Sequence, residues 1–323
     1  MSKKNQESIS DEKLHIKTKN SFMDKSILKN ADVYLMMLPV LIHIFVFCYI
    51  PMYGVIIAFQ NYSPGKPFLS FDGSVDWVGL QHFTDFVTNP YFWRLIKNTL
   101  VFSGLYLAIG FWMPIAFALV LNEVHVVKYK KFVQTASYLP HFISSVVVAG
   151  MVLSFINSEG VINQVRMLVG TEAIPFNIEP SYFPVIYTIT NIWQNFGWGS
   201  ILYLSAMSAI DPGQYEAARL DGAGRFKQMW HVTLPAIRPT IAILLIFDIG
   251  GILNTNSEMI LLLYNSAVYE TADVIGTYVY RAGLVGGEFS YGSAVGLFTS
   301  AIGFGLVYLA NVASRKLSGY SLW

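Results

Sequence analysis

Two clusters of aromatic, amide and hydroxyl side chains lie within apolar stretches of the sequence. Polar groups inside a bilayer cost free energy, so they usually face a cavity or another helix. Aromatic rings can stack on the faces of a sugar ring while amides bond its hydroxyl groups, so one hypothesis is a sugar path. The alternative is that these side chains bond one membrane helix to another. The first cluster is Trp193, Gln194, Asn195 and Trp198, and the second is Asn254, Asn256, Ser257 and Glu258.

The spacing within each cluster predicts shared helix faces. Trp198 follows Asn195 by three positions, and Ser257 follows Asn254 by three. Residues three or four positions apart are neighbours on the surface of an α-helix. We therefore expect each cluster to present its polar groups together.

Asp248 and Glu258 are acidic residues in these apolar stretches. A proton-coupled carrier needs such a group, which keeps a secondary carrier open as an alternative function. The two acids can equally pair with a partner subunit or lie near an interface. His43 and His141 lack a second histidine or a carboxylate at metal-ligand spacing, so we expect both to pack rather than to bind metal.

Motifs that would indicate an enzyme are absent from the sequence. It contains no HExxH motif, no GxSxG motif and no phosphate-binding P-loop. We therefore predict no catalytic residue, no metal site and no ATP hydrolysis by this chain itself.

A polar segment at about residues 211–239 separates two apolar stretches and has the pattern of two helices around a turn. Asp211 is a good N-cap and Pro212 suits the first helical position. Gly222 is free to take the left-handed conformation that ends a helix. We expect Leu234 and Pro235 to close the unit. Phe226, Met229, Trp230 and Thr233 follow at helical spacing, which places them on one face.

The composition indicates that these groups are positioned by membrane helices. The chain of 323 residues is 54% hydrophobic and only 13% charged, whereas a soluble domain is about a quarter charged. The apolar residues form blocks near the ~20 residues that a membrane helix needs. We predict an all-α integral membrane protein with six transmembrane helices, over residues 34–59, 96–121, 132–155, 183–204, 240–263 and 293–313.

Positive charge predicts the orientation of these spans. Of the 21 Lys and Arg residues, 16 fall in segments that lie on the inner side if the N-terminus is inside. Cytoplasmic loops carry such an excess, so we expect both termini to be cytoplasmic. Residues 1–30 are polar and lysine-rich, so we expect a cytoplasmic tail there and a permease domain over residues 31–323. The formal net charge of +1 gives no indication of nucleic acid.

The polar segment at 211–239 resembles the EAA loop of permeases in binding-protein-dependent ABC importers. The resemblance implies a type I ABC importer permease fold, with a coupling helix that sits in a groove of a cytoplasmic ATPase. It further implies that Glu216 anchors the ATPase contact and that Gly222 supplies the turn. The alternative is an amphipathic loop on the bilayer surface. The resemblance lies in Glu216, Ala217, Ala218, Asp221, Gly222, Ala223, Phe226, Leu234, Pro235 and Pro239.

Further stretches look like the maltose-type branch of these permeases, which includes the alginate-importer permeases. They are residues 50–59, 77–80, 138–144, 280–281 and 289–293. The resemblance implies a bacterial plasma-membrane protein that imports oligosaccharides, with sugar contacts at positions matching Asn195, Trp198, Asn254 and Ser257. The first outer loop is shorter than that of the maltose permease, which favours the polysaccharide branch.

The resemblance also implies a set of partners. They are a second permease, two ABC ATPase subunits that hold ATP and Mg, and an extracellular solute-binding protein, with no cofactor in this chain. Three alternatives to this function remain. They are a proton-driven carrier using Asp248 or Glu258, an intramembrane enzyme acting on a lipid-linked sugar, and an importer of a non-sugar solute.

Overall fold

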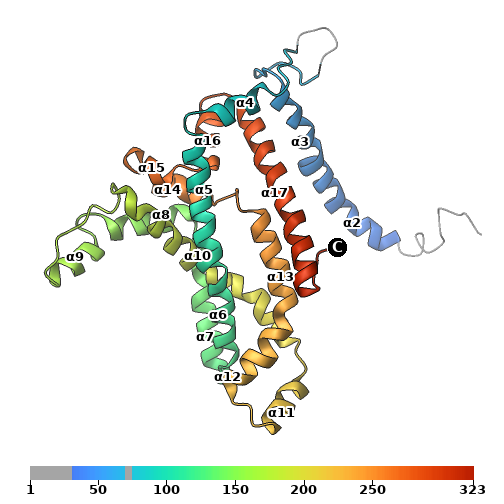
Figure 1. The fold of residues 1–323 in the computed structure, drawn as a ribbon, viewed down its shortest axis with the longest axis vertical. Coiled ribbons are helices and arrows are strands. Elements are labelled where there is room, and N and C mark those ends of the chain that lie inside the picture. The colour runs from blue at the N-terminus through green and yellow to red at the C-terminus, as the bar shows by residue number, and fades with distance from the viewer. Residues whose placement is uncertain (1–30, 70–74) are drawn as a thin grey trace, which may run out of the picture. The chain divides into compact units, whose positions relative to one another are not determined.

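The computed structural model describes residues 31–69 and 75–323, and within them the chain is helical, with one isolated bridge between Gln60 and Trp77 (Figure 1). The predicted tail at residues 1–30 lies outside the described residues. The chain divides into two units, Met1–Gly54 and Val55–Trp323. The described part of the first unit holds α2 (Ala31–Ile44), a π-helical turn (Phe45–Tyr49) and α3 (Ile50–Met52).

Residues 81–168 of the larger unit form a series of helices. They are α4 (Gln81–Thr88), α5 (Phe92–Leu105), η3 (Tyr106–Gly110), α6 (Trp112–Asn122), α7 (Val127–Tyr138), η4 (Leu139–Phe142), α8 (Ser145–Ile156) and α9 (Val161–Leu168). The remainder comprises α10 (Phe183–Ser208), α11 (Pro212–Leu220), α12 (Arg225–Gln228), η6 (Met229–Thr233), α13 (Leu234–Gly250), α14 (Ser257–Leu263), α15 (Tyr269–Ala272), α16 (Ile275–Val279), η8 (Tyr280–Val285) and α17 (Phe289–Ser318).

Five helical stretches among the described residues are long and apolar enough to cross a membrane. They are Asp32–Phe59, Phe92–Asn122, Ser145–Leu168, Arg225–Gly250 and Phe289–Ser318. The 26 residues of α10 also suffice in length. Its central polar residues lower its mean hydropathy, however, and it is not among the five. The predicted bundle of apolar helices is confirmed, while the count of six spans stays a prediction.

Two of the predicted spans are wrong as single helices. The span at 132–155 is divided, because the chain turns at Pro140 and Ser144 then caps α8 by accepting a hydrogen bond from Val147 N. The span at 240–263 ends at Gly250, and residues 251–256 are not helical before Asn256 caps α14. Asn254 and Ser257 therefore do not share a helix face.

The long helix α10 is the centre of the larger unit. It packs against α6, α7 and α13, and Figure 1 shows these helices side by side. Gly197 permits the approach to α7, because a Cβ at this position would lie 2.0 Å from the Ser137 carbonyl oxygen. One buried cluster on this helix face consists of Phe111, Ile115, Ala118, Tyr203, Met207 and Ile237.

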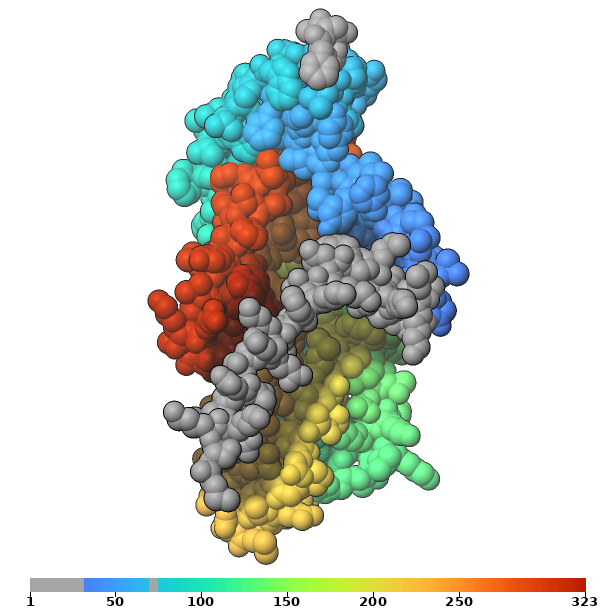
Figure 2. Space-filling view, turned by 90° about the vertical axis from the view of Figure 1, so that its right-hand side faces the viewer, coloured from blue at the N-terminus to red at the C-terminus, as the bar shows by residue number. Residues whose placement is uncertain are grey.

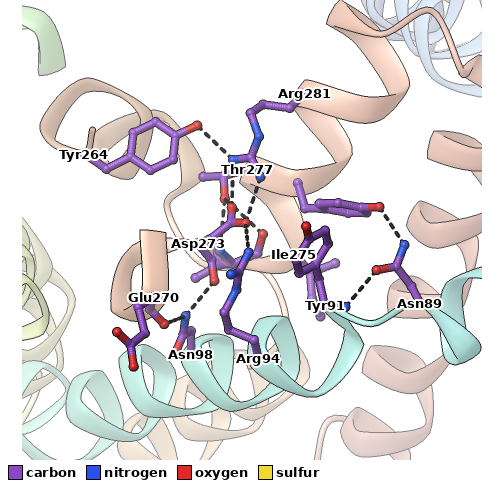
Figure 3. Close-up of polar contacts among 12 residues, drawn as sticks. Asn89, Tyr91, Arg94, Asn98, Tyr264, Glu270, Asp273, Ile275, Thr277 and Arg281 are labelled. Carbon is purple, nitrogen blue, oxygen red and sulfur yellow. Dashed lines mark hydrogen bonds and ion pairs between the residues drawn. The ribbon is translucent and has the colours of Figure 1, made fainter. Parts of the chain in front are cut away.

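A buried carboxylate ties the segment between α14 and α17 to α5. The fully buried Asp273 accepts two hydrogen bonds of 2.8 Å from Arg281 and forms a 3.3 Å ion pair with Arg94 (Figure 3). Its Oδ1 also accepts a 2.8 Å bond from Thr277, and Asn98 donates to its backbone carbonyl. The hydrogen bonds that Arg281 donates to Asp273 raise the pKa of Arg281, so the guanidinium stays charged.

Candidate functional site

A cavity of about 420 Å³ lies along α10, between α5–α6 and the end of α13. Aromatic rings form much of its wall, and amide and hydroxyl groups lie between them. Its volume falls in the range of pockets that hold small ligands. Its lining includes Phe102, Tyr106, Tyr187, Thr188, Asn191, Asn195, Phe196, Trp198, Phe247, Asp248, Asn254, Thr255 and Asn256.

Three of the six predicted path residues, Asn195, Trp198 and Asn254, line this cavity. Asn195 and Trp198 lie on α10, as their spacing predicts. Asn254 reaches the cavity from the non-helical segment at 251–256. The cavity therefore joins the two sequence clusters, although the second cluster is not helical at Asn254.

The other three predicted path residues do not line the cavity. Trp193 is exposed elsewhere on α10, with 40% of its surface accessible. Gln194 is buried and donates a 3.1 Å hydrogen bond to the Ile143 carbonyl, which fits the helix-to-helix alternative. The Ser257 hydroxyl donates to the Thr255 carbonyl at 3.2 Å. Gln194 and Ser257 thus use their side chains in hydrogen bonds to backbone carbonyls, while Trp193 is exposed outside the cavity.

A hydrogen-bonded row on α10 was missed by the sequence analysis. Asn195 Nδ2 donates to Asn191, and Asn191 Nδ2 donates to the Tyr187 hydroxyl at 3.1 Å. All three residues line the cavity. The spacing of four between them was visible in the sequence and predicts one helix face. The cavity neighbours contributed by α5 and η3 had no comparable signal.

His141 also has a more specific place than the packing role expected for it. Its Nδ1 lies 3.0 Å from Asn195 Oδ1, and its ring is parallel to the indole of Trp198. The histidine comes from η4, the turn that divides the predicted third span. Because sequence reasoning expected a continuous helix there, it gave no reason to place His141 beside α10.

The two acids considered for proton coupling have different surroundings. Asp248 lines the cavity from α13 and is half-buried. No ion pair to it occurs among the described residues. Glu258 lies in the first turn of α14 and is exposed. Only Asp248 is therefore placed to face a molecule in the cavity.

The segment at 211–239 forms the predicted pair of helices around a glycine turn. Asp211 Oδ1 accepts a 2.9 Å bond from Gly213 N and caps α11. Gly222 has a φ of +75°, in the left-handed region. The Gly222 and Ala223 amides donate to the carbonyls of Arg219 and Ala218, which satisfies the end of the helix. The helix–turn–helix prediction is confirmed.

The end of this segment differs from the prediction. Leu234 and Pro235 do not close the unit, because α12, the π-helical turn η6 and α13 form one continuous helical stretch, Arg225–Gly250. Pro235 lies in the first turn of α13, directly after the π-helical turn η6. The chain thus leaves the loop as a helix. The Tyr215 hydroxyl lies 2.9 Å from Thr233 Oγ1 and joins α11 to this stretch.

Most of the coupling residues suggested by the resemblance lie on the outer surface of this segment, whereas Leu234 packs on a buried cluster and Pro235 is half-buried. Figure 1 shows α11 at the lower end of the molecule, and Figure 2 shows that end in yellow. Glu216, Ala217, Asp221 and Gly222 are exposed, and Ala218 and Ala223 are half-buried. Phe226 is 72% exposed and stacks on Trp230, with ring centroids 6.5 Å apart. Exposed apolar and small side chains of this kind typically meet a partner.

The described residues combine long apolar helices, a cavity lined by aromatic and amide side chains, and an exposed helix–turn–helix segment, which is consistent with a membrane transport protein. Residues 124–319 match the family described as "Binding-protein-dependent transport system inner membrane component". The chain belongs to this family and has the fold of a type I ABC importer permease.

Relatives of known name support the same assignment. The chain is 47% identical over 291 residues to the polygalacturonan/rhamnogalacturonan transport system permease YteP of Bacillus subtilis (strain 168), covering 90% of this chain and 89% of YteP. It is 28% identical to the arabinooligosaccharides transport system permease AraP of the same organism, covering 90% of each. A crystal structure of a bacterial ABC transporter involved in alginate import matches with a TM-score of 0.81 and 42% identity, covering 91% of this chain and 98% of that one.

Proposed function

We propose that this chain forms one half of the translocation path of an ATP-driven importer, and that its cargo is an oligosaccharide or a fragment of a polysaccharide. The observation that carries the proposal is the cavity along α10, where aromatic rings alternate with amides and hydroxyls. Pyranose rings present apolar faces and a rim of hydroxyl groups. A lining of this composition suits both, through stacking and through hydrogen bonds.

The names of the relatives support a carbohydrate cargo. The YteP and AraP transporters are named for polygalacturonan/rhamnogalacturonan and for arabinooligosaccharides. A second crystal structure, with 42% identity and a TM-score of 0.81, is of an alginate transporter in complex with a periplasmic protein that holds an alginate pentasaccharide. By analogy, an extracellular solute-binding protein delivers the saccharide to this chain and to a second, similar permease.

The energy source in this proposal lies in separate subunits. The sequence has no P-loop, so two cytoplasmic ATPase subunits bind ATP and Mg. The exposed surface of α11, with Glu216 and the turn at Gly222, is the part of the chain that meets them. When the ATPases close, α11 moves with them, and because α12, η6 and α13 are continuous, the motion reaches the cavity wall at Asp248.

The proposed location is the bacterial plasma membrane, with both termini and α11 on the cytoplasmic side. The distribution of lysine and arginine supports this orientation. It places the Asp273 cluster on the outer side, next to the docking protein. The ATPases and the binding protein then meet opposite ends of the same permease.

Replacement of Trp198 tests whether the cavity is the sugar path. The permease complex with its ATPases, purified from native membranes, is reconstituted in vesicles and given labelled oligosaccharide with the binding protein. We expect Trp198→Ala to lower the saccharide imported per ATP hydrolysed by about tenfold, because a stacking surface is lost.

Trp193→Ala is the matched control, since Trp193 is a tryptophan of similar exposure on the same helix but outside the cavity. Equal import per ATP by Trp198→Ala and Trp193→Ala would place the sugar path elsewhere. Import of a peptide or a polyamine but of no saccharide would contradict the cargo.

A further inference from the structure

His141 lies against Trp198, on the wall of the cavity that the proposed function uses. The imidazole and the indole are parallel within 4°, and their centroids are 4.7 Å apart. Phe142 meets the same indole edge-on at 5.4 Å. Within the described residues, Trp198 lines the cavity and His141 does not. The turn η4 therefore holds the indole from outside the cavity, while 44% of the surface of Trp198 stays accessible.

The hydrogen bonds of Asn195 fix how His141 is held. Asn195 Nδ2 lies 2.9 Å from the Asn191 backbone carbonyl, which can only accept. The amide orientation is therefore determined, and its Oδ1 faces His141 Nδ1 at 3.0 Å. Because Oδ1 can only accept, His141 Nδ1 carries the proton. In the neutral ring Nε2 then has the free lone pair.

The same bonds show that Asn195 has little capacity left for a ligand. Its Nδ2 is shared between the carbonyl and the Oδ1 of Asn191, and its Oδ1 is occupied by His141. Its amide serves to orient the imidazole. The imidazole in turn covers one side of the indole. This places the tryptophan, rather than Asn195, as the group offered to a saccharide.

We propose that His141 is a positioning residue of the saccharide path, which sets the plane of the Trp198 indole so that a sugar ring can stack on it. The inference rests on the proposed function, since it assumes that a saccharide enters the cavity. Two features of His141 can be separated, and we expect the ring contact to have the larger effect. The ring supplies the stacking contact with Trp198, and Nδ1–H supplies the hydrogen bond that orients the ring.

Three substitutions separate the two contributions. His141→Phe keeps a flat ring against Trp198 and loses the hydrogen bond. His141→Asn keeps a donor near the position of Nδ1 and loses the ring. His141→Ala loses both. The measured quantity is saccharide imported per ATP hydrolysed by the reconstituted complex at saturating loaded binding protein, because a general loss of folded complex lowers import and hydrolysis together and leaves the ratio unchanged.

We expect His141→Ala and His141→Asn to lower this ratio by about three- to tenfold, the equivalent of one aromatic stacking contact. His141→Phe should stay within about twofold of the wild type, which would show rescue by the ring alone. His125→Ala is the control, since His125 is an exposed histidine between α6 and α7.

Two results would overturn the proposal. One is a ratio for His141→Ala equal to that of His125→Ala. The other is a ratio for His141→Phe as low as that of His141→Ala, because the stacking contact would then have no effect. Trp198→Ala, measured alongside, separates this failure from failure of the proposed function. If the Trp198→Ala complex imports normally, the saccharide path does not run through this cavity. If only Trp198→Ala lowers the ratio and the His141 variants do not, the proposed function stands and His141 has no positioning role.

Discussion

At the scale of single residues, hydrogen-bond partners decide which polar side chains of the cavity remain available. Asn191 and Asn195 bond each other and their helix neighbours. Asn254 is exposed and lines the cavity from outside any helix. Gln194 was grouped with Asn195 by sequence, yet its amide donates to the Ile143 carbonyl. A polar residue in an apolar stretch thus indicates a need for a hydrogen-bond partner. Whether that partner lies within the protein decides whether the residue is available to cargo.

Asp248 is the residue at which ATP-driven and proton-driven transport give different predictions. A proton carrier needs the carboxyl of Asp248 to titrate during each cycle, whereas an ATP-driven importer does not. We expect Asp248→Asn to retain at least about half of the wild-type import per ATP hydrolysed, and we expect a protonophore to leave import by both proteins unchanged. The measurement is labelled saccharide uptake with and without protonophore.

Glu258→Gln is the matched control for Asp248→Asn, because it removes the other candidate acid at an exposed site outside the cavity. Collapse of wild-type import on adding the protonophore, together with its abolition in Asp248→Asn alone, would favour a secondary carrier.

At the scale of elements, we expect the backbone conformation of the turn after α11 to affect coupling to the ATPases. Gly222 has a φ of +75° and open space around it, so a side chain there is opposed by backbone strain rather than by a clash. We expect Gly222→Val to cost the loop about 1–3 kcal/mol. ATP hydrolysis by the assembled complex should continue, while saccharide imported per ATP falls at least about fivefold.

Gly224→Val is the control for this turn. Gly224 also has open space but lies at a φ of −67°, which valine adopts without strain. Normal coupling in Gly222→Val, or equal uncoupling in both variants, would mean that the shape of this turn does not transmit the ATPase motion.

The Asp273 cluster predicts a second effect at this scale, on stability. Asp273→Asn removes the charge that both Arg94 and Arg281 face, leaving two guanidinium groups close together. We expect the variant to lose about 3–5 kcal/mol of unfolding free energy, seen as a lower thermal midpoint in detergent.

Glu270→Gln serves as the comparison for Asp273→Asn, because Glu270 is exposed and its carboxylate points away from the two guanidinium groups (Figure 3). It should change stability by less than about 0.5 kcal/mol. Equal midpoints for the two variants would show that the buried ion pairs do not stabilise the segment between α14 and α17.

The elements differ in how far the sequence predicts them. The apolar block predicted from residue 183 begins where α10 begins. The glycine turn at Gly222 was predicted with the Asp211 cap, because local residue types decide both. The breaks at Pro140 and at residues 251–256 were missed, although Pro140, Ser144 and Asn256 are all recognisable signals in the sequence. Averaged hydropathy over 20 residues hides a short break within an apolar stretch.

Contacts between distant elements lie beyond such local signals. His141 and Trp198 are brought together by the packing of η4 on α10. Asp273 and Arg94 meet because α5 passes the segment before α16. No sequence periodicity or motif predicts that the two residues of either pair meet. The candidate path could be predicted as a region, therefore, but not as the specific wall that Trp198, Asn254 and Asp248 form.

At the scale of the whole molecule, the exposed α11 and the cavity are connected by one continuous helical stretch. The exposed α11 packs on the helical stretch Arg225–Gly250 through Tyr215 and Thr233. That stretch ends at the cavity, where it contributes Asp248. A partner that moves α11 therefore acts on the cavity wall through a continuous helix. This continuity is the structural basis for the proposed coupling between ATPase subunits and the cavity.

The most direct test of this account is the ATP requirement of import by the purified complex. Vesicles that contain the permease complex and its ATPases are loaded with ATP and Mg, or with neither, and receive labelled oligosaccharide on its binding protein. An ATP-driven importer should accumulate saccharide only with ATP, and the Trp198→Ala complex should accumulate little of it. Accumulation without ATP, or with the permease chain alone, would contradict this account.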